Sequence, residues 1–110
     1  MPRRPSDAQL EAKYQNDILI PRLYRILPDP IIRKFDIQQG FPDLLILCEK
    51  WWGVLEVKPF AGADEQPNQD YWVQHFNHMS FGSFIWPAIE EEVLSALQRS
   101  FKSSRSSRIS

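Results

Sequence analysis

Three ionisable residues stand at the ends of two apolar segments near the middle of the chain. Asp43 directly precedes the run Leu44–Cys48, and Glu56 and Lys58 lie at the end of the run Trp51–Val57. Two carboxylates that lie close together repel each other unless a cation sits between them. An all-oxygen site of this kind suits Mg²⁺, which would bind a phosphate and lower the pKa of a bound water. A neighbouring lysine could position that water and offset charge that develops on the phosphorus.

The same residues also have a simpler interpretation. Asp43 could cap the end of a strand, and Glu56 with Lys58 could form a surface ion pair. Acidic and basic residues are common, so the choice depends on whether the elements that carry these residues bring them together.

The two apolar runs predict an antiparallel hairpin that turns at Glu49-Lys50. In this register the numbers of facing residues sum to 99, so Asp43 faces Glu56. Facing side chains point to the same side of the sheet, about 5 Å apart, and Lys58 shares that side because strand side chains alternate. A register shifted by two residues would keep the three together, whereas a shift by one would scatter them.

Apolar periodicity and turn residues predict the element order α-β-β-β-α-β-α. The first helix begins at a capping box, Ser6–Gln9, and has Leu10, Tyr14 and Ile18 on its apolar side. It is expected to kink or restart at Pro21, because proline lacks an N–H group and its ring clashes with the preceding turn. Strands are predicted at 31–37, 44–48, 51–57 and 83–86, with a turn at 38–40. Two further helices are predicted, one at 67–79 and one from 87 onward.

Composition limits the class of protein. The chain has 110 residues, and its 13 basic and 14 acidic side chains give a net charge of −1, which neither requires nor excludes a polyanionic partner. This length predicts one domain over residues 1–101, followed by a disordered basic, Ser-rich tail over 102–110. The single cysteine, Cys48, excludes an internal disulfide and a cysteine-based zinc site. No segment has the length and apolarity of a membrane span or a signal peptide, which predicts a cytoplasmic protein with no membrane partner.

The motif residues resemble the signature of the PD-(D/E)xK nuclease superfamily. More narrowly, they are similar to small phage and VRR-NUC-type nucleases and to phage junction-resolving endonucleases. The matching segments are Gly40–Asp43, Leu44–Leu47, Leu55–Lys58, the pair Glu11 and Gln15, and Pro67–Gln69 with Trp72, followed by Gly82–Ile85. The resemblance implies an α/β fold with that superfamily's αβββαβ core, a mixed sheet flanked by helices.

A metal site is the first implication of the resemblance. Asp43 and Glu56 would be direct ligands of Mg²⁺, for which Mn²⁺ would substitute. The backbone carbonyl of Val57 would be a third ligand, and Glu11 would reach the metal directly or through water.

The resemblance also implies a reaction. Lys58 would position the attacking water, and Gln69 would face the site from the second predicted helix. The implied activity is that of a metal-dependent DNA endonuclease that leaves 5′-phosphate and 3′-hydroxyl ends, with a preference for branched, flap or junction DNA. A phage-encoded enzyme in the host cytoplasm would fit. The alternative is a non-catalytic nucleic-acid-binding or assembly protein on the same scaffold, although carboxylates without metal would repel phosphate.

A homodimer is expected on three grounds. A chain this short, with one predicted active site, would not span a branched substrate alone. A chain this short has a small core, which extra apolar burial would help to stabilise. Its second half also carries more large aromatic residues than such a core can readily hide, and an exposed aromatic cluster commonly marks an interface. Trp51 and Trp52 at the hairpin tip and the second predicted helix are the expected contacts.

Overall fold

A computed structural model of the chain describes residues 4–35, 40–64 and 67–109. Its centre is a mixed sheet with the strand order β1-β2-β3-β4, in which β4 is parallel to β3 and the other neighbours are antiparallel. The strands are β1 (Ile31–Lys34), β2 (Leu44–Cys48), β3 (Trp51–Val57) and β4 (Gly82–Ile85). This confirms the predicted α/β class with a mixed sheet.

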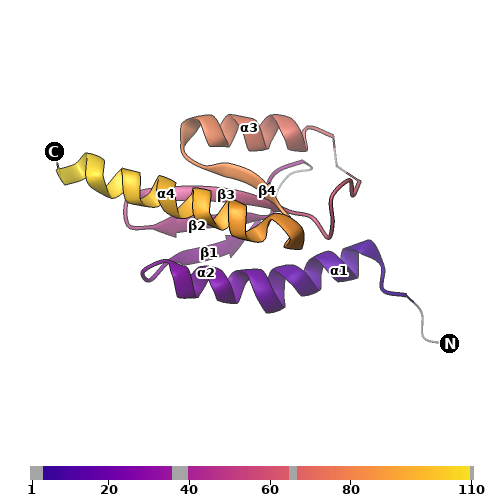
Figure 1. Cartoon of the computed structure of the whole chain (residues 1–110). Helices are drawn as coiled ribbons and strands as arrows, with labels where there is room; N and C mark the ends of the chain where they lie inside the picture. Colours follow the sequence, from indigo (N-terminus) through magenta and orange to yellow (C-terminus); the bar gives the residue numbers. More distant parts are fainter. Residues whose placement is uncertain (1–3, 36–39, 65–66, 110) are drawn as a thin grey trace.

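Helices flank the sheet on both faces (Figure 1). One face carries α3 (Gln69–Met79), and the other carries α1 (Asp7–Lys13), α2 (Ile20–Ile26) and α4 (Glu90–Ile109). The element order differs from the prediction at both ends. Three helical segments precede β1, and a short 3-10 turn, η2 (Pro87–Ile89), stands between β4 and α4.

The predicted hairpin register is confirmed. Cys48 pairs with Trp51 and Leu45 pairs with Val54, so the numbers of facing residues sum to 99. The bounds of β2 and β3 also agree with the prediction. Strand β1 is shorter than expected, and residues 36–39, which include most of the predicted turn before Gly40, lie outside the described residues.

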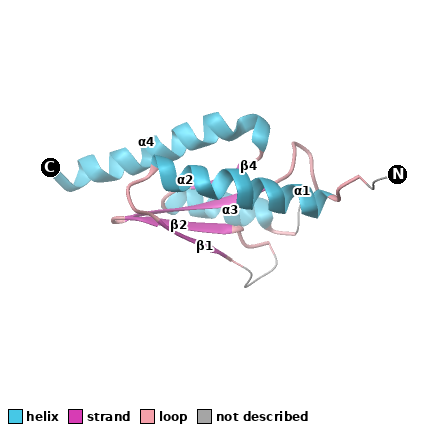
Figure 2. Cartoon of the chain, turned by 90° about the horizontal axis from the view of Figure 1, so that it is seen from below, coloured by secondary structure: helices cyan, strands magenta, loops and turns pink. Residues whose placement is uncertain are grey.

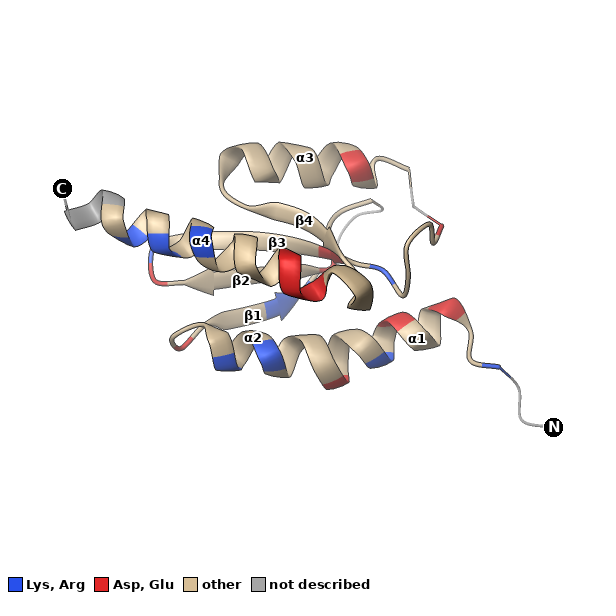
Figure 3. Ribbon diagram, viewed as in Figure 1, with Lys and Arg blue, Asp and Glu red and all other residues tan. Residues whose placement is uncertain are grey.

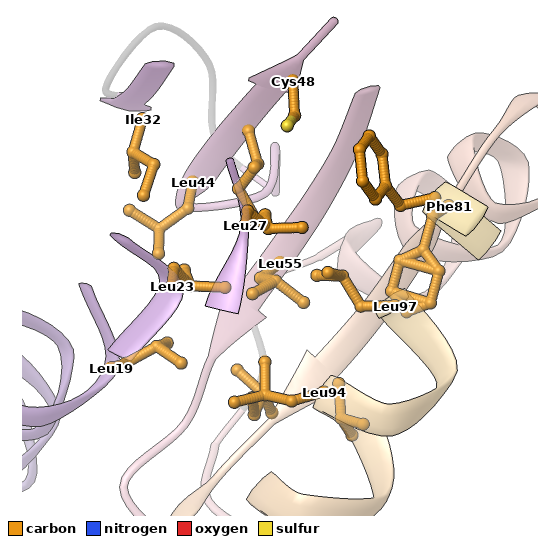
Figure 4. Packing of buried hydrophobic residues seen from close by; sticks show 14 of the residues in the cluster. Leu19, Leu23, Leu27, Ile32, Leu44, Cys48, Leu55, Phe81, Leu94 and Leu97 are labelled. Carbon is orange, nitrogen blue, oxygen red and sulfur yellow. The ribbon is translucent and has the colours of Figure 1, made fainter. Parts of the chain in front are cut away.

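The hydrophobic core lies between the sheet and the helices α2 and α4 (Figure 4). Alternate residues of β2 and β3 face it, because side chains alternate between the two faces of a strand. Its fully buried members include Leu19, Leu23, Leu44, Ile46, Leu55, Ile85, Leu94 and Leu97. Burying a side chain of this size stabilises the fold by about 1.5–3 kcal/mol, so this face holds the hairpin in place.

The run from α1 to α2 is continuous (Figure 2) and passes through a π-helical segment, η1 (Tyr14–Leu19), instead of restarting at Pro21. Pro21 cannot fit a regular α-helix without a clash one turn earlier, and the wider turn accommodates it. The Ile20 N–H bonds to a carbonyl five residues back. The extra residue moves the buried side by one position: Leu19 is buried, whereas Ile18 is 51% exposed. The predicted placement of Ile18 on the apolar side is therefore wrong.

Helix α4 continues to Ile109, which differs from the disordered tail predicted from Lys102 onward. Phe101 is buried and its ring packs against that of Trp51. The Arg105 guanidinium lies 4.6 Å from the centre of the Phe101 ring and pairs with Glu49 at the hairpin turn. These contacts hold the first turns of the predicted tail against the hairpin.

Candidate active site

The hairpin places Asp43 and Glu56 beside each other where β2 begins and β3 ends. The last strand pair is Leu44 with Leu55, so Asp43 and Glu56 are the next facing residues. Asp43 Oδ2 accepts a hydrogen bond from the backbone N–H of Val57 at 2.8 Å. This bond extends the hairpin by a side chain in place of a backbone group, and it fixes the orientation of the Asp43 carboxylate.

Three polar side chains are buried together at this end of the sheet. Glu56 is 2% exposed, Lys58 5% and Gln69 6%. The Gln69 amide bridges the other two: its Oε1 accepts from Lys58 Nζ at 2.7 Å, and its Nε2 donates to Glu56 Oε2 at 3.0 Å. The amide can satisfy both neighbours in only one orientation, because its oxygen accepts and its nitrogen donates.

Two further groups surround the lysine. Lys58 Nζ donates to the backbone carbonyl of Asp64 at 2.9 Å, and it lies 5.8 Å from the centre of the Phe84 ring. No sequence pattern indicates either contact. A backbone carbonyl can belong to any residue, and the register of β4 beside β3 depends on tertiary packing.

The loop before Asp43 packs directly on the start of α3. Gly40 has a φ of +84°, and a Cβ atom there would lie 2.3 Å from the carbonyl oxygen of Pro67. Asn68, the residue before Gln69, also has a left-handed conformation, with φ +71°. Because Gly40 has no Cβ, the loop can pack this closely on the residues before α3. This close contact brings Gln69, the first residue of α3, into reach of the strand ends.

Burial and a neighbouring carboxylate raise the pKa values of two carboxyl groups of the site. Burial raises the pKa of Glu56 to about 9, and the neighbouring Asp43 carboxylate adds to the shift while Lys58 opposes it. The pKa of Glu11 is also raised, first by burial and then by repulsion from Asp43, with Lys58 again opposing. Glu11 on α1 therefore belongs to the same electrostatic cluster as the two hairpin carboxyl groups.

The donor set fits a hard divalent cation. In the described part of the chain, Glu56 Oε1 is a buried acceptor with no hydrogen-bond partner, and the Asp43 carboxylate stands beside it. Within the same residues, no three His, Cys, Asp or Glu side chains are arranged to hold a metal ion on their own. Asp43 and Glu56 would thus share a metal with backbone or water oxygens, a mixed set that is usual for Mg²⁺.

The structure brings together the residues that the hairpin register and the family resemblance selected for the site. They are Glu11, Asp43, Glu56, Val57, Lys58 and Gln69. The contact that the structure shows for Val57 is made by its N–H group, and the role of its carbonyl as a metal ligand stays a prediction.

Comparisons of the chain with models of protein families, with curated proteins and with solved structures found no significant match. The superfamily resemblance therefore rests on the motif residues. Among the described helices, none is both long and apolar enough to cross a membrane.

Proposed function

We propose that this chain is a metal-dependent phosphodiester hydrolase that acts on DNA as an endonuclease. The observation that carries the proposal is the buried series of contacts from Glu56 through Gln69 to Lys58, with Asp43 alongside. Burial of charged groups costs free energy, and an ion pair between them would recover part of it. Within residues 4–35, 40–64 and 67–109, however, Lys58 makes no ion pair within 4.0 Å, and Gln69 stands between it and Glu56.

This separation has a chemical use. Among the described residues, two of the three N–H donors of Lys58 Nζ are used, for Gln69 and for the Asp64 carbonyl, so one can point to a substrate phosphate or a water molecule. In the metal-free chain the raised pKa of Glu56 keeps a proton on this carboxyl beside Asp43, and a divalent cation could replace that proton and bind oxygens of both groups. A structural ion pair would bring the lysine and the carboxyl group into direct contact, whereas here the Gln69 amide keeps them apart, which supports a catalytic role.

In an in-line hydrolysis, some of these residues would bind the metal and Lys58 would act on the attacking water and the phosphate. Asp43 and Glu56 would hold Mg²⁺ or Mn²⁺ with the Val57 carbonyl, and Glu11 would add a direct or water-mediated contact. When bound, the metal polarises the phosphate and lowers the pKa of water. Lys58 would position the attacking water and stabilise the charge that develops on the phosphate.

A homodimer and a preference for branched DNA remain proposals. Trp51 is buried within its own chain and donates to Ser100 Oγ at 2.9 Å, so it is not available to a partner. Exposed apolar side chains of α3, Tyr71 at 59% and Met79 at 61%, support α3 as the side on which a second copy would pack.

Cleavage of defined DNA substrates tests the proposal. Purified protein should cut at least one of single-stranded, duplex, flap or four-way DNA with Mg²⁺ or Mn²⁺, and EDTA should abolish cleavage. Glu56→Gln and Lys58→Ala should each reduce the rate by about 10³-fold while DNA affinity is kept. Matched controls are Glu92→Gln and Lys50→Ala, which change exposed residues away from the site.

Two outcomes would contradict the proposal. Cleavage that survives in both site variants would show that Glu56 and Lys58 are not catalytic. DNA binding without cleavage under any metal condition would instead support the non-catalytic alternative.

A further inference from the structure

One carboxylate joins the two sides of the π-helical segment η1. Glu90, the first residue of α4, accepts from Tyr14 Oη through Oε1 at 2.8 Å and from Arg22 through Oε2 at 2.5 Å. Tyr14 is the first residue of η1 and Arg22 lies beyond its end, in α2. Figure 3 shows the acidic first turn of α4 close to the α1–α2 run.

The two hydrogen bonds to Glu90 resist a change in the helical register of η1. Tyr14 is only 4% exposed and its ring lies in the hydrophobic core, and Arg22 also contacts Glu91. The charged contacts from Arg22 hold the Glu90 carboxylate toward Tyr14. Both ends of η1 are therefore tied to a single point on a different helix.

The register of η1 decides the direction in which α1 presents its side chains. A residue added to or removed from a helix rotates the part before that position by about 100° relative to the part after it. Glu11 is partly buried and lies three residues before the buried Tyr14, so the two share one side of the helical run, and the charges of Asp43 and Lys58 act on Glu11. A return of η1 to regular α-helix would turn Glu11 away from both.

We propose that Tyr14 and Glu90 are positioning residues for the candidate metal site: their hydrogen bond keeps η1 in the register that directs Glu11 toward the side of the helical run that faces the site. This inference rests on the proposed function, because it assigns Glu11 a part in holding the metal. The Tyr14 hydroxyl donates to the Glu90 carboxylate, which also accepts from Arg22. Both residues therefore act on the site through the helix that carries Glu11.

Titration of the metal-free chain with Mn²⁺ in a calorimeter tests the proposal without any substrate. Tyr14→Phe keeps the buried ring and removes only the hydroxyl, and it should weaken Mn²⁺ binding about tenfold, as loss of a supporting contact typically does. In a Glu11→Gln background the same change should alter the affinity less than about twofold. The control is Ser100→Ala, which removes one partly buried hydrogen bond, that from Trp51, at the opposite end of the sheet.

Amide hydrogen exchange gives a second readout that needs no metal. The amides of residues 14–19 should exchange faster in Tyr14→Phe than in Ser100→Ala. An Mn²⁺ affinity that falls equally in both variants, or falls as much without Glu11 as with it, would overturn the positioning role. A wild-type chain that binds no Mn²⁺ would instead overturn the proposed function, so the two failures are distinguishable.

Discussion

The buried carboxyl of Glu56 should make the stability of the metal-free protein depend on pH. Its pKa is about 9 in the folded chain, against an ordinary value of 4.5. Below about pH 4.5 the carboxyl is protonated in both the folded and the unfolded chain. Between about pH 4.5 and 9 it is protonated only in the folded chain, so the free energy of unfolding falls by about 1.4 kcal/mol per pH unit. The stabilisation from this group is lost as the pH rises through 9.

Glu56→Gln should remove this dependence. Glutamine has nearly the same shape, stays neutral, and can still accept the hydrogen bond from Gln69 Nε2. Near pH 4.5 the variant and the wild type should unfold with similar free energies. At pH 7.5, about three units higher, the variant should be more stable by about 4 kcal/mol. A substitution that removes a proposed metal ligand should thus stabilise the metal-free fold.

Urea unfolding in EDTA, followed by tryptophan fluorescence from pH 4.5 to 9, measures this difference. Glu92→Gln, an exposed position on α4, is the control and should track the wild type at every pH. Addition of Mg²⁺ at 100 times its Kd should stabilise the wild type by about 2.7 kcal/mol and leave Glu56→Gln unchanged. A gap between variant and wild type that does not vary with pH would refute the reasoning, because Glu56 would then be ionised in the folded chain.

Three other changes have defined outcomes in thermal or urea unfolding. Gly40→Ala should lower the free energy of unfolding by more than about 2 kcal/mol, because the added Cβ would clash with a backbone carbonyl. Gly62→Ala, where φ is a similar +79° but the space is open, should lower it by only about 1 kcal/mol. Equal losses in the two variants would contradict the role of close packing at Gly40. Gln69→Ala should cost about 2–3 kcal/mol, since it leaves a buried lysine and a buried glutamate each short of a partner, and a neutral effect would refute the bridging role. Ser6→Ala removes the capping box of α1 and should cost about 1 kcal/mol, whereas the exposed helical Ser95→Ala should cost nothing; if both behave alike, the cap does not matter.

The central hairpin could be predicted from the sequence because its determinants are local. A short break between two apolar runs favours one register, and the strand period of two then decides which side chains share a face. The register predicted in this way sets Asp43 beside Glu56, and the structure agrees. Gln69 could be selected only through the motif resemblance, since its position depends on how the Gly40 loop packs on α3.

The helical run before β1 shows where local reasoning stops. The sequence predicts a disturbance at Pro21, but a kink, a restart and a π turn all relieve the same clash. The choice among them depends on Leu19 fitting the core and on the Tyr14 contact with α4, which are tertiary interactions. Helix α4 beyond Phe101 is a similar case, because low-complexity composition does not reveal that Arg105 meets Glu49 across the hairpin turn.

Anomalous X-ray scattering from a crystal grown with Mn²⁺ tests most directly whether Asp43 and Glu56 form a metal-dependent catalytic centre. We predict a single strong manganese peak within bonding distance of carboxylate oxygens of both Asp43 and Glu56. Lys58 Nζ should still donate to Gln69, and the peak should be absent from crystals of Glu56→Gln. A manganese peak elsewhere on the protein, or an empty site in crystals of protein that cleaves DNA with Mn²⁺, would contradict the assignment of these residues as the catalytic centre.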